Sequence, residues 1–256
     1  MGLLASLARM FGRQQKPGAS TIQVGVGAGL RFNHATSNPD YAYGSNELPV
    51  QQVLAQYLAR DAVFYDVGAN VGFLTVIGAR LVGPRGIVYA FEPVPDNATF
   101  VRSNAAANGF MNVEVIEKAV TSHSGSAELA LATYSGGAVL SEFATPPDAA
   151  GMLRVDLASI DDLVERSGLK PPSFVKIDVE GAELSVLQGM ERTAARHRPM
   201  ILYELDDAES EPLQRKQAEC EQWLLARGYR VAELPESYAG IDWLVKHFLA
   251  TPIEPG

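Results

Sequence analysis

The sequence predicts an α/β protein built on a mostly parallel sheet. Two segments carry this prediction, residues 63–72 and 174–183, because each is an apolar run that reaches an acidic residue, passes through glycine and continues into a helical pattern. Apolar strands that alternate with helices are typical of parallel sheets covered by helices. We therefore expect both segments to contribute strands to one sheet.

The first segment predicts a strand, a glycine turn and a helix. Residues 63–67 suit a buried strand, while Gly68 and Gly72 allow a tight turn and a close approach to a ligand. The helix that follows has apolar residues at helical spacing and should end at Gly83. The glycine-rich residues 25–29 precede no helical pattern, so we interpret them as a strand or turn.

Two acidic residues in this region favour a particular kind of cofactor. Glu92 follows the apolar run 87–91 and lies about twenty residues beyond Gly72, where a βαβ unit places the acid that binds a ribose. Asp66 precedes the glycine loop, where a carboxylate would repel the phosphates of a dinucleotide and would suit a cation. S-adenosylmethionine carries an ammonium and a sulfonium group, so it fits better. The alternative is a tight turn in an α/β domain that binds no cofactor.

The middle of the chain predicts one more helix and strand and then a different structure. We expect a helix over residues 95–108 and a strand over 113–117. In residues 121–157, small and polar residues alternate with short β-type pieces, which predicts a hairpin and loop insertion. Ser159 and Asp162 then have the spacing of a helix cap.

The second segment repeats the plan of the first, and the next apolar run, 200–202, ends at Tyr203 and Glu204. Four acids are therefore predicted at carboxyl ends of strands: Asp66, Glu92, Asp178 and Glu204. In a doubly wound sheet these ends share one edge. A single acid there could be a solvated loop charge, and we favour a helix-start role for Glu183, but that explanation is poor for all four acids together.

The C-terminal part predicts a polar helix over residues 209–227 and two strands, 229–234 and 241–246. No helix pattern separates these strands, so we expect an antiparallel hairpin at the edge of the sheet. A dehydrogenase of the Rossmann type keeps its later strands parallel, so this pattern disfavours one.

Composition narrows the class further. The chain of 256 residues is 47% hydrophobic and carries a net charge of −9, which predicts one domain over residues 21–256 and no binding of nucleic acid. Residues 1–20 are expected to be a flexible or weakly amphipathic lead-in, for which contact with a membrane surface is the second interpretation. The single cysteine, Cys220, is expected to be a buried thiol in a cytoplasmic protein.

Histidine spacing predicts no metal site. His34, His123, His197 and His247 have no ligand spacing, and each is expected to be a surface residue or to have its hydrogen bonds satisfied.

With these motifs in order, the sequence resembles the FkbM-type S-adenosylmethionine-dependent methyltransferases over residues 41–205. The motifs are Gly44-Ser-Asn-Glu47, Asp66-Val-Gly-Ala-Asn-Val-Gly72, Phe91-Glu-Pro93, Asn104 to Asn108, Lys176-Ile-Asp-Val-Glu-Gly-Ala-Glu183, Val186-Leu-Gln-Gly189 and the strand ending at Glu204. The resemblance implies a class I methyltransferase fold, with a seven-stranded, mostly parallel sheet that has one antiparallel edge strand and helices on both faces. It also implies O-methylation of a hydroxyl on a sugar, a glycolipid or a polyketide-type small molecule.

The family pattern also implies a set of cofactor-binding residues. Asp66, Gly68 and Asn70 would line the methionine part of S-adenosylmethionine, Glu92 would bind the ribose hydroxyls, and Ala119 would flank the adenine. The complete set that we predict is Asp66, Gly68, Ala69, Asn70, Gly72, Glu92, Pro93, Ala119 and Asp178.

Methyl transfer is a displacement at carbon, so the protein must align the acceptor oxygen, exclude water and accept the hydroxyl proton. Our hypothesis is that Asp178 contacts the cofactor ammonium or orients the acceptor and that Glu180 or Glu204 receives the proton. Lys176 is expected to form a structural salt bridge.

Three alternatives stay open. In the first, Asp178 and Glu204 hold a magnesium ion that activates the acceptor, as in catechol O-methyltransferases. In the second, the chain is a cofactor-binding scaffold without turnover. A nicotinamide enzyme is the weakest of the three.

Overall fold

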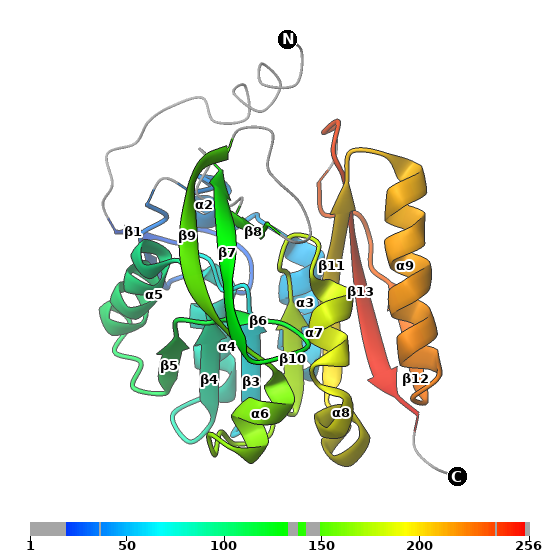
Figure 1. Cartoon of the computed structure of the whole chain (residues 1–256). Helices are drawn as coiled ribbons and strands as arrows, with labels where there is room; N and C mark the ends of the chain where they lie inside the picture. Colours follow the sequence, from blue (N-terminus) through cyan, green and yellow to red (C-terminus); the bar gives the residue numbers. More distant parts are fainter. Residues whose placement is uncertain (1–18, 36, 133–137, 142–148, 239, 254–256) are drawn as a thin grey trace.

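The computed structural model describes residues 19–35, 37–132, 138–141, 149–238 and 240–253. Its centre is a seven-stranded sheet with the order β12-β13-β11-β10-β3-β4-β5 (Figure 1). The strands are β3 (Val63–Val67), β4 (Ile87–Phe91), β5 (Val113–Ile116), β10 (Phe174–Ile177), β11 (Met200–Asp207), β12 (Tyr229–Glu233) and β13 (Leu244–Pro252). The predicted α/β fold with a mostly parallel sheet is confirmed.

The reversed strand is β13, which pairs antiparallel with both β11 and β12. It therefore lies one place inside the edge, and β12 is the edge strand. The closing antiparallel hairpin is confirmed, but the last strand begins at Leu244 rather than at residue 241 and continues to Pro252.

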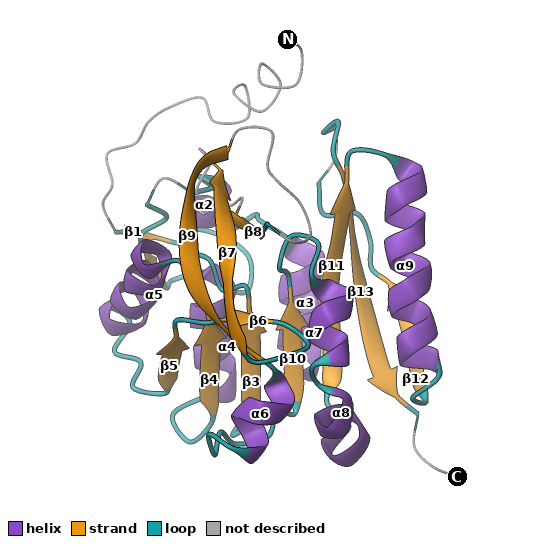
Figure 2. Ribbon diagram, viewed as in Figure 1, coloured by secondary structure: helices purple, strands orange, loops and turns teal. Residues whose placement is uncertain are grey.

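Helices cover both faces of the sheet, as Figure 2 shows. One face carries α3 (Leu48–Tyr57), α4 (Phe73–Val82) and α5 (Pro95–Ala107). The other carries α6 (Ile160–Glu165), α7 (Glu183–Gln188), α8 (Glu191–His197) and α9 (Ser210–Leu225). The strands alternate their side chains between the two apolar cores, since Phe64 packs with the first group of helices and Tyr65 with the second.

Local signals placed several helix ends correctly. Helix α4 ends at Gly83, and the side chain of Ser159 accepts a hydrogen bond from the backbone N–H of Asp162 at the start of α6. Cys220 of α9 is buried in the core, as expected. In the described part of the chain, no helix combines the length and the apolar character needed to cross a bilayer.

The expected end of the strand at Tyr203 and Glu204 is wrong. Strand β11 continues to Asp207, because β13 supplies antiparallel hydrogen-bonding partners beyond the point where the parallel partner β10 has ended at Ile177. Glu204 therefore lies within a strand, directly opposite His247 of β13.

The described residues between 119 and 158 form a second sheet beside the first. It contains β6 (Ala119–Val120), β7 (Gly125–Ala132), β8 (Ala138–Leu140) and β9 (Ala149–Ala158) in the order β6-β9-β7-β8. Strands β7 and β9 form a long antiparallel pair, visible in Figure 2, in the region where we expected a hairpin and loop insertion. The predicted lead-in falls almost wholly on residues 1–18, which lie outside the described residues.

The N-terminal segment is held to the core by two asparagine side chains. Residues 25–29 form a turn, as expected, between the short strands β1 (Ser20–Thr21) and β2 (Arg31–Phe32). On α5, the side chain of Asn104 accepts from the N–H of Asn33 and donates to its carbonyl, and Asn108 does the same with Arg31. Two side chains one helical turn apart thus satisfy the backbone as a neighbouring strand would.

The next turn of the chain is fixed by Gln51 of α3. Its side chain donates to the carbonyl oxygens of Gly44 and Asn46 and accepts from the N–H of Val26. Helix α2 (Asp40–Tyr43) precedes this turn, and Glu47 follows it as the N-cap residue of α3. The contacts of Gln51 therefore determine where Glu47 lies.

Replacing Asn104 with Ala is expected to lower the free energy of unfolding by about 1–3 kcal/mol, because it leaves the buried carbonyl of Val71 and partly buried backbone groups of Asn33 without partners. Chemical denaturation measures this change. Asn108→Ala is the matched control and should cost less, since water can replace its more exposed contacts. Equal losses in the two variants would contradict the role given to Asn104.

Candidate active site

A cavity opens where β3, β4 and β10 lead into their loops, beside Glu204 of β11, and Leu129 of β7 and Leu140 of β8 close one side of it. Several of the predicted cofactor residues line it: Gly68, Asn70, Glu92, Pro93, Ala119 and Asp178. Glu180 and Glu204, two of the predicted catalytic residues, line it as well. The structure thus brings most of the predicted site into one cavity.

The glycine loop is held in a conformation that few residues adopt. Gly68 has φ +78°, and a side-chain carbon there would overlap the backbone carbonyl of Asp178. Gly72, at the N-cap of α4, has φ +89° and lies against Val101. Gly72 and Ala69 shape the loop from behind and do not belong to the described lining of the cavity. Their predicted contact with the cofactor therefore has no support from this geometry.

Glu92 is the polar centre of the first half of the cavity. One carboxylate oxygen accepts a hydrogen bond from the backbone N–H of Asn70 at 2.8 Å, and the other accepts from the N–H of Val94 at 2.9 Å. Burial raises the pKa of Glu92 to about 7, although these backbone hydrogen bonds oppose the shift. A carboxylate has about four acceptor positions, so Glu92 keeps capacity for the hydroxyl groups of a ligand.

The position of Asp66 requires a correction. Its carboxylate is buried behind the loop and does not belong to the described lining of the cavity. It accepts a hydrogen bond from Thr75 at 2.5 Å and lies 3.6 Å from the ammonium of Lys176. The argument that its charge faces a cationic ligand is therefore wrong, because Lys176 already compensates that charge.

Lys176 connects the two loops that the sequence predicted. Its ammonium lies 3.1 Å from Asp178 and donates to the carbonyl of Gly68 at 3.0 Å. Burial alone would lower the pKa of Lys176, but the charges of Asp178 and Asp66 outweigh this and raise it. Lys176 is thus permanently charged, and the predicted structural salt bridge is confirmed.

The second half of the cavity is strongly acidic. Burial raises the pKa of Glu180 well above its ordinary value, and the charges of Asp206, Asp178 and Glu204 add to the effect. Burial likewise raises the pKa of Glu204, with further contributions from Asp178 and Glu47. Carboxyl groups with raised pKa values are suited to accept protons from a hydroxyl group near neutral pH.

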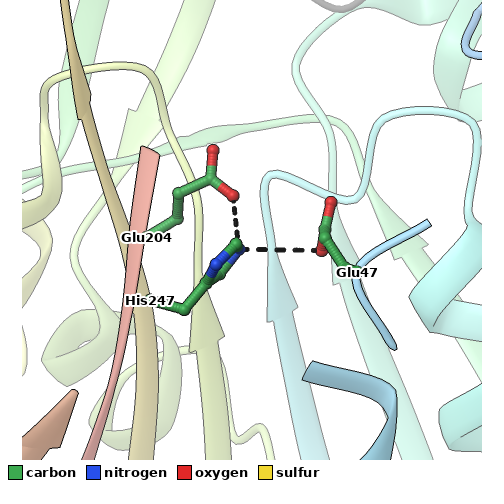
Figure 3. Close-up of side chains that lie close together, drawn as sticks. All are labelled: Glu47, Glu204 and His247. Atoms are coloured by element: carbon green, nitrogen blue, oxygen red, sulfur yellow. Dashed lines mark ion pairs between the residues drawn. The ribbon is translucent and has the colours of Figure 1, made fainter. Parts of the chain in front are cut away.

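Three residues that sequence analysis left without a role complete this half: Glu47, Tyr238 and His247. Figure 3 shows Glu47 and Glu204 approaching His247 from two sides. The imidazole Nε2 lies 2.6 Å from Glu204 and 4.0 Å from Glu47, while the hydroxyl of Tyr238 donates to Glu47 at 2.6 Å. Burial lowers the pKa of His247, although the charges of Glu47 and Asp178 oppose this.

The expectation for the histidines is wrong at two positions. His34 and His247 are both buried, and each has a ring nitrogen without a hydrogen-bond partner among the described residues. Glu47 could have been identified as a site residue from the sequence, because it ends the Gly44-Ser-Asn-Glu47 motif. His247 could not be found in this way, because only the pairing of β11 with β13 brings it opposite Glu204.

Backbone strain accompanies these functional candidates. Glu47, Asn70 and Glu180 all have positive φ angles, between 48° and 54°, and all line the cavity. Residues other than glycine rarely adopt this left-handed region, and where they do the surrounding structure must hold them. Such positions concentrate at binding and catalytic sites.

Comparison with known proteins gives the class of this fold and site. A sequence profile described as "Methyltransferase FkbM domain" matches residues 66–231, more than half of the chain. The crystal structure of Methyltransferase FkbM from Methylobacillus flagellatus KT superposes with a TM-score of 0.51 at 18% identity, covering 74% of this chain and 44% of that one. The fold is that of the class I S-adenosylmethionine-dependent methyltransferases.

The chain belongs to the FkbM methyltransferase family, whose cofactor is S-adenosylmethionine. It is 30% identical over 145 residues to Hexuronic acid methyltransferase AglP of Haloferax volcanii, a match that covers 56% of each chain. It is 26% identical over 158 residues to 31-O-demethyl-FK506 methyltransferase FkbM of Streptomyces tacrolimicus, covering 50% of this chain and 59% of that one. The chain thus matches somewhat more than half the length of these relatives.

Replacing Lys176 with Met is expected to destabilise the fold by about 3–5 kcal/mol, because it leaves the buried Asp66 without its counter-charge. Urea denaturation measures the loss. Lys246→Met is the control, since Lys246 forms a half-exposed ion pair with Glu233 and its removal should change stability little. If the two variants were equally stable, Lys176 would not connect the loops as described.

Proposed function

We propose that this chain transfers a methyl group from S-adenosylmethionine to a hydroxyl group of a sugar or a polyketide-type small molecule. The observation that carries the proposal is the single cavity in which Glu92, the ribose-type acid, and Glu180, a half-buried carboxyl with a raised pKa, lie together. One half of the cavity would bind the cofactor, and the other would bind the acceptor and take its proton.

The cofactor would occupy the half formed by β3, β4 and β6. Glu92 would accept hydrogen bonds from the two ribose hydroxyls, and Pro93 and Ala119 would contact the adenine and ribose. Gly68 and Asn70 would lie along the methionine part. Asp178, whose side chain is 27% exposed, would meet the ammonium group of the cofactor.

The acceptor would enter from the side of β11. Attack of its oxygen on the methyl carbon breaks the carbon–sulfur bond and releases neutral S-adenosylhomocysteine, so the hydroxyl proton must go to a base. We assign that role to Glu180 in preference to Glu204, because an oxygen of Glu204 already lies 2.6 Å from His247. Asp178 would orient the acceptor or the cofactor.

The names of the relatives support an oxygen acceptor. One acts on a hexuronic acid, and the other on the 31-O-demethyl form of FK506. Both fit the polar lining of the acceptor half, which includes Asn38 and Tyr238. The chain would therefore act on a small molecule or a glycan rather than on a nucleic acid.

Cofactor binding tests the first half of this proposal. Glu92→Gln is expected to weaken S-adenosylmethionine binding at least tenfold near pH 8, because a hydrogen bond to a charged group is worth roughly 1.5–3 kcal/mol. Calorimetry measures the affinity. Glu114→Gln, an exposed substitution on β5, is the control.

The pH dependence gives a second test of Glu92. Its pKa of about 7 means that the group is protonated below that pH and charged above it. Since the carboxylate is the better acceptor for ribose hydroxyls, affinity should increase as the pH passes upward through about 7 in the native chain. Glu92→Gln should lack this increase, and an equal increase in both proteins would assign it to another group.

Turnover tests the second half of the proposal, in which the acceptor binds and loses its proton. With labelled S-adenosylmethionine and a panel of hexuronic acids, other sugars and macrolides, the native chain should methylate at least one acceptor. Glu180→Gln is expected to reduce kcat by about 100-fold or more while leaving cofactor affinity close to native, because a positioned base typically contributes 10²–10⁴. The exposed substitution Glu211→Gln on α9 is the control. Full turnover by Glu180→Gln would remove it from the mechanism.

A further inference from the structure

Glu47, Glu204 and His247 are arranged as a set of ligands around one point. Each offers one ligand atom, and all three atoms lie within 4.8 Å of one another. They come from three distant parts of the chain: the N-cap of α3, strand β11 and strand β13. Figure 3 shows both carboxylates directed at the same edge of the imidazole ring.

The state of His247 points to a missing partner. The residue is only 4% exposed, and its Nε2 lies 2.6 Å from Glu204 yet makes no well-oriented hydrogen bond to any described residue. A buried polar nitrogen without a well-oriented hydrogen bond is costly, and it is rare in native structures. The atom faces the gap between the two carboxylates, where a ligand would satisfy it.

The other ring nitrogen is already oriented. The hydroxyl of Ser237 lies 3.2 Å from Nδ1 of His247, and the hydroxyl of Tyr238 and the amide of Asn46 both donate to the same oxygen of Glu47. Metal-binding histidines and carboxylates are typically held in this way by outer hydrogen bonds. These contacts leave Nε2 and the second oxygen of Glu47 directed toward Glu204.

The charges nearby favour a cation. Glu47, Glu204, Asp178 and Glu180 all line the cavity. Lys118, which also lines it, forms an ion pair with Asp156, and Lys176 is paired with Asp66 and Asp178. Several carboxylates that face one another away from water raise each other's free energy unless a positive charge joins them. A divalent ion between Glu47 and Glu204 would supply that charge.

We propose that Glu47, Glu204 and His247 bind a first-row divalent cation, Zn²⁺ or Mn²⁺, with an open coordination position facing the acceptor half of the cavity. One nitrogen and two oxygen ligands suit these ions, and three protein ligands with one open position are typical of catalytic sites. Metal–ligand bonds of about 2.1 Å place tetrahedral ligand atoms about 3.4 Å apart. The present separations, 2.6 Å and 4.0 Å from His247, reach that value through sub-ångström shifts of the two carboxylates.

This ligand set differs from the magnesium site considered for Asp178 and Glu204, because it includes a nitrogen and excludes Asp178. Binding of the ion does not depend on the proposed methyl transfer. The use of the ion in catalysis does depend on the methyl transfer. An acceptor with two neighbouring oxygens, such as a vicinal diol or a hydroxy acid, would chelate the ion from the open position. That step rests on the proposed function.

Calorimetric titration of the chelator-treated full chain with ZnCl₂, MnCl₂ and MgCl₂ tests the site. We expect one equivalent of Zn²⁺ or Mn²⁺ to bind, and His247→Ala and Glu204→Gln each to weaken binding at least about 100-fold. His197→Ala and Glu219→Gln, both exposed, are matched controls that should bind as the native chain does. Absence of a single stoichiometric site, or equal binding by His247→Ala, would overturn the proposal.

Two further measurements keep the test independent of folding and of turnover. Ser237→Ala, which touches only the outer nitrogen of His247, should weaken binding about tenfold without unfolding the chain. The visible spectrum of the Co²⁺ form should report bound nitrogen and oxygen ligands and should be lost in Glu204→Gln. If the chain bound S-adenosylmethionine and methylated an acceptor with no cation bound, this inference would fail while the proposed function would stand. If the chain bound the cation but not S-adenosylmethionine, the cation site would stand and the proposed function would fail.

Discussion

The ammonium of Lys176 is the contact on which the geometry of this site depends. It bridges Asp66 at the end of β3, the carbonyl of Gly68 in the glycine loop and Asp178 after β10. These groups lie at or just beyond the ends of two neighbouring parallel strands, whose side chains also pack together, as Phe64 of β3 does with Phe174 of β10. One buried cation therefore determines how closely the two loops approach, and the absence of a side chain at Gly68 permits that approach. Glu92 and Asp178 line the same cavity because of it.

The two halves of the cavity differ in their balance of acidic and basic groups. Around β3 and β4, each acid has a partner: Lys176 lies beside Asp66, and backbone N–H groups hold Glu92, although burial raises the pKa of both acids. Around β11 the acids outnumber the cations, and burial and mutual repulsion raise the pKa values of Glu180 and Glu204. The first half is preorganised before any ligand arrives, whereas the second lowers its free energy by taking up protons or a cation. A binding half and a reacting half differ in this way at many enzyme sites.

What could be predicted from the sequence was local along the chain. A strand, a glycine loop and a helix are neighbours in sequence, so their motifs pointed to Gly68, Asn70 and Glu92, which line one cavity, and predicted the parallel character of the sheet. The direction of a carboxylate was not predictable: Asp66 turns away from the cavity because Lys176 and Thr75 attract it. The extent of β11 was missed for a related reason, since it depends on pairing with a strand that forms later in the chain.

The half of the cavity proposed for the acceptor is assembled by contacts between distant residues. For this reason its chemistry could not be predicted from local sequence motifs. His247 faces Glu204 through the antiparallel register of β13, while Glu47 is placed by Gln51 and held by Tyr238. A change of one residue in that register would turn His247 to the opposite face of the sheet. Local motifs therefore define the half of the cavity in which we propose that the cofactor binds, and the tertiary fold defines the half that we propose for the acceptor. Within one family, the half formed by local motifs can stay constant while the half formed by distant residues changes with the acceptor, because the two halves depend on different parts of the chain.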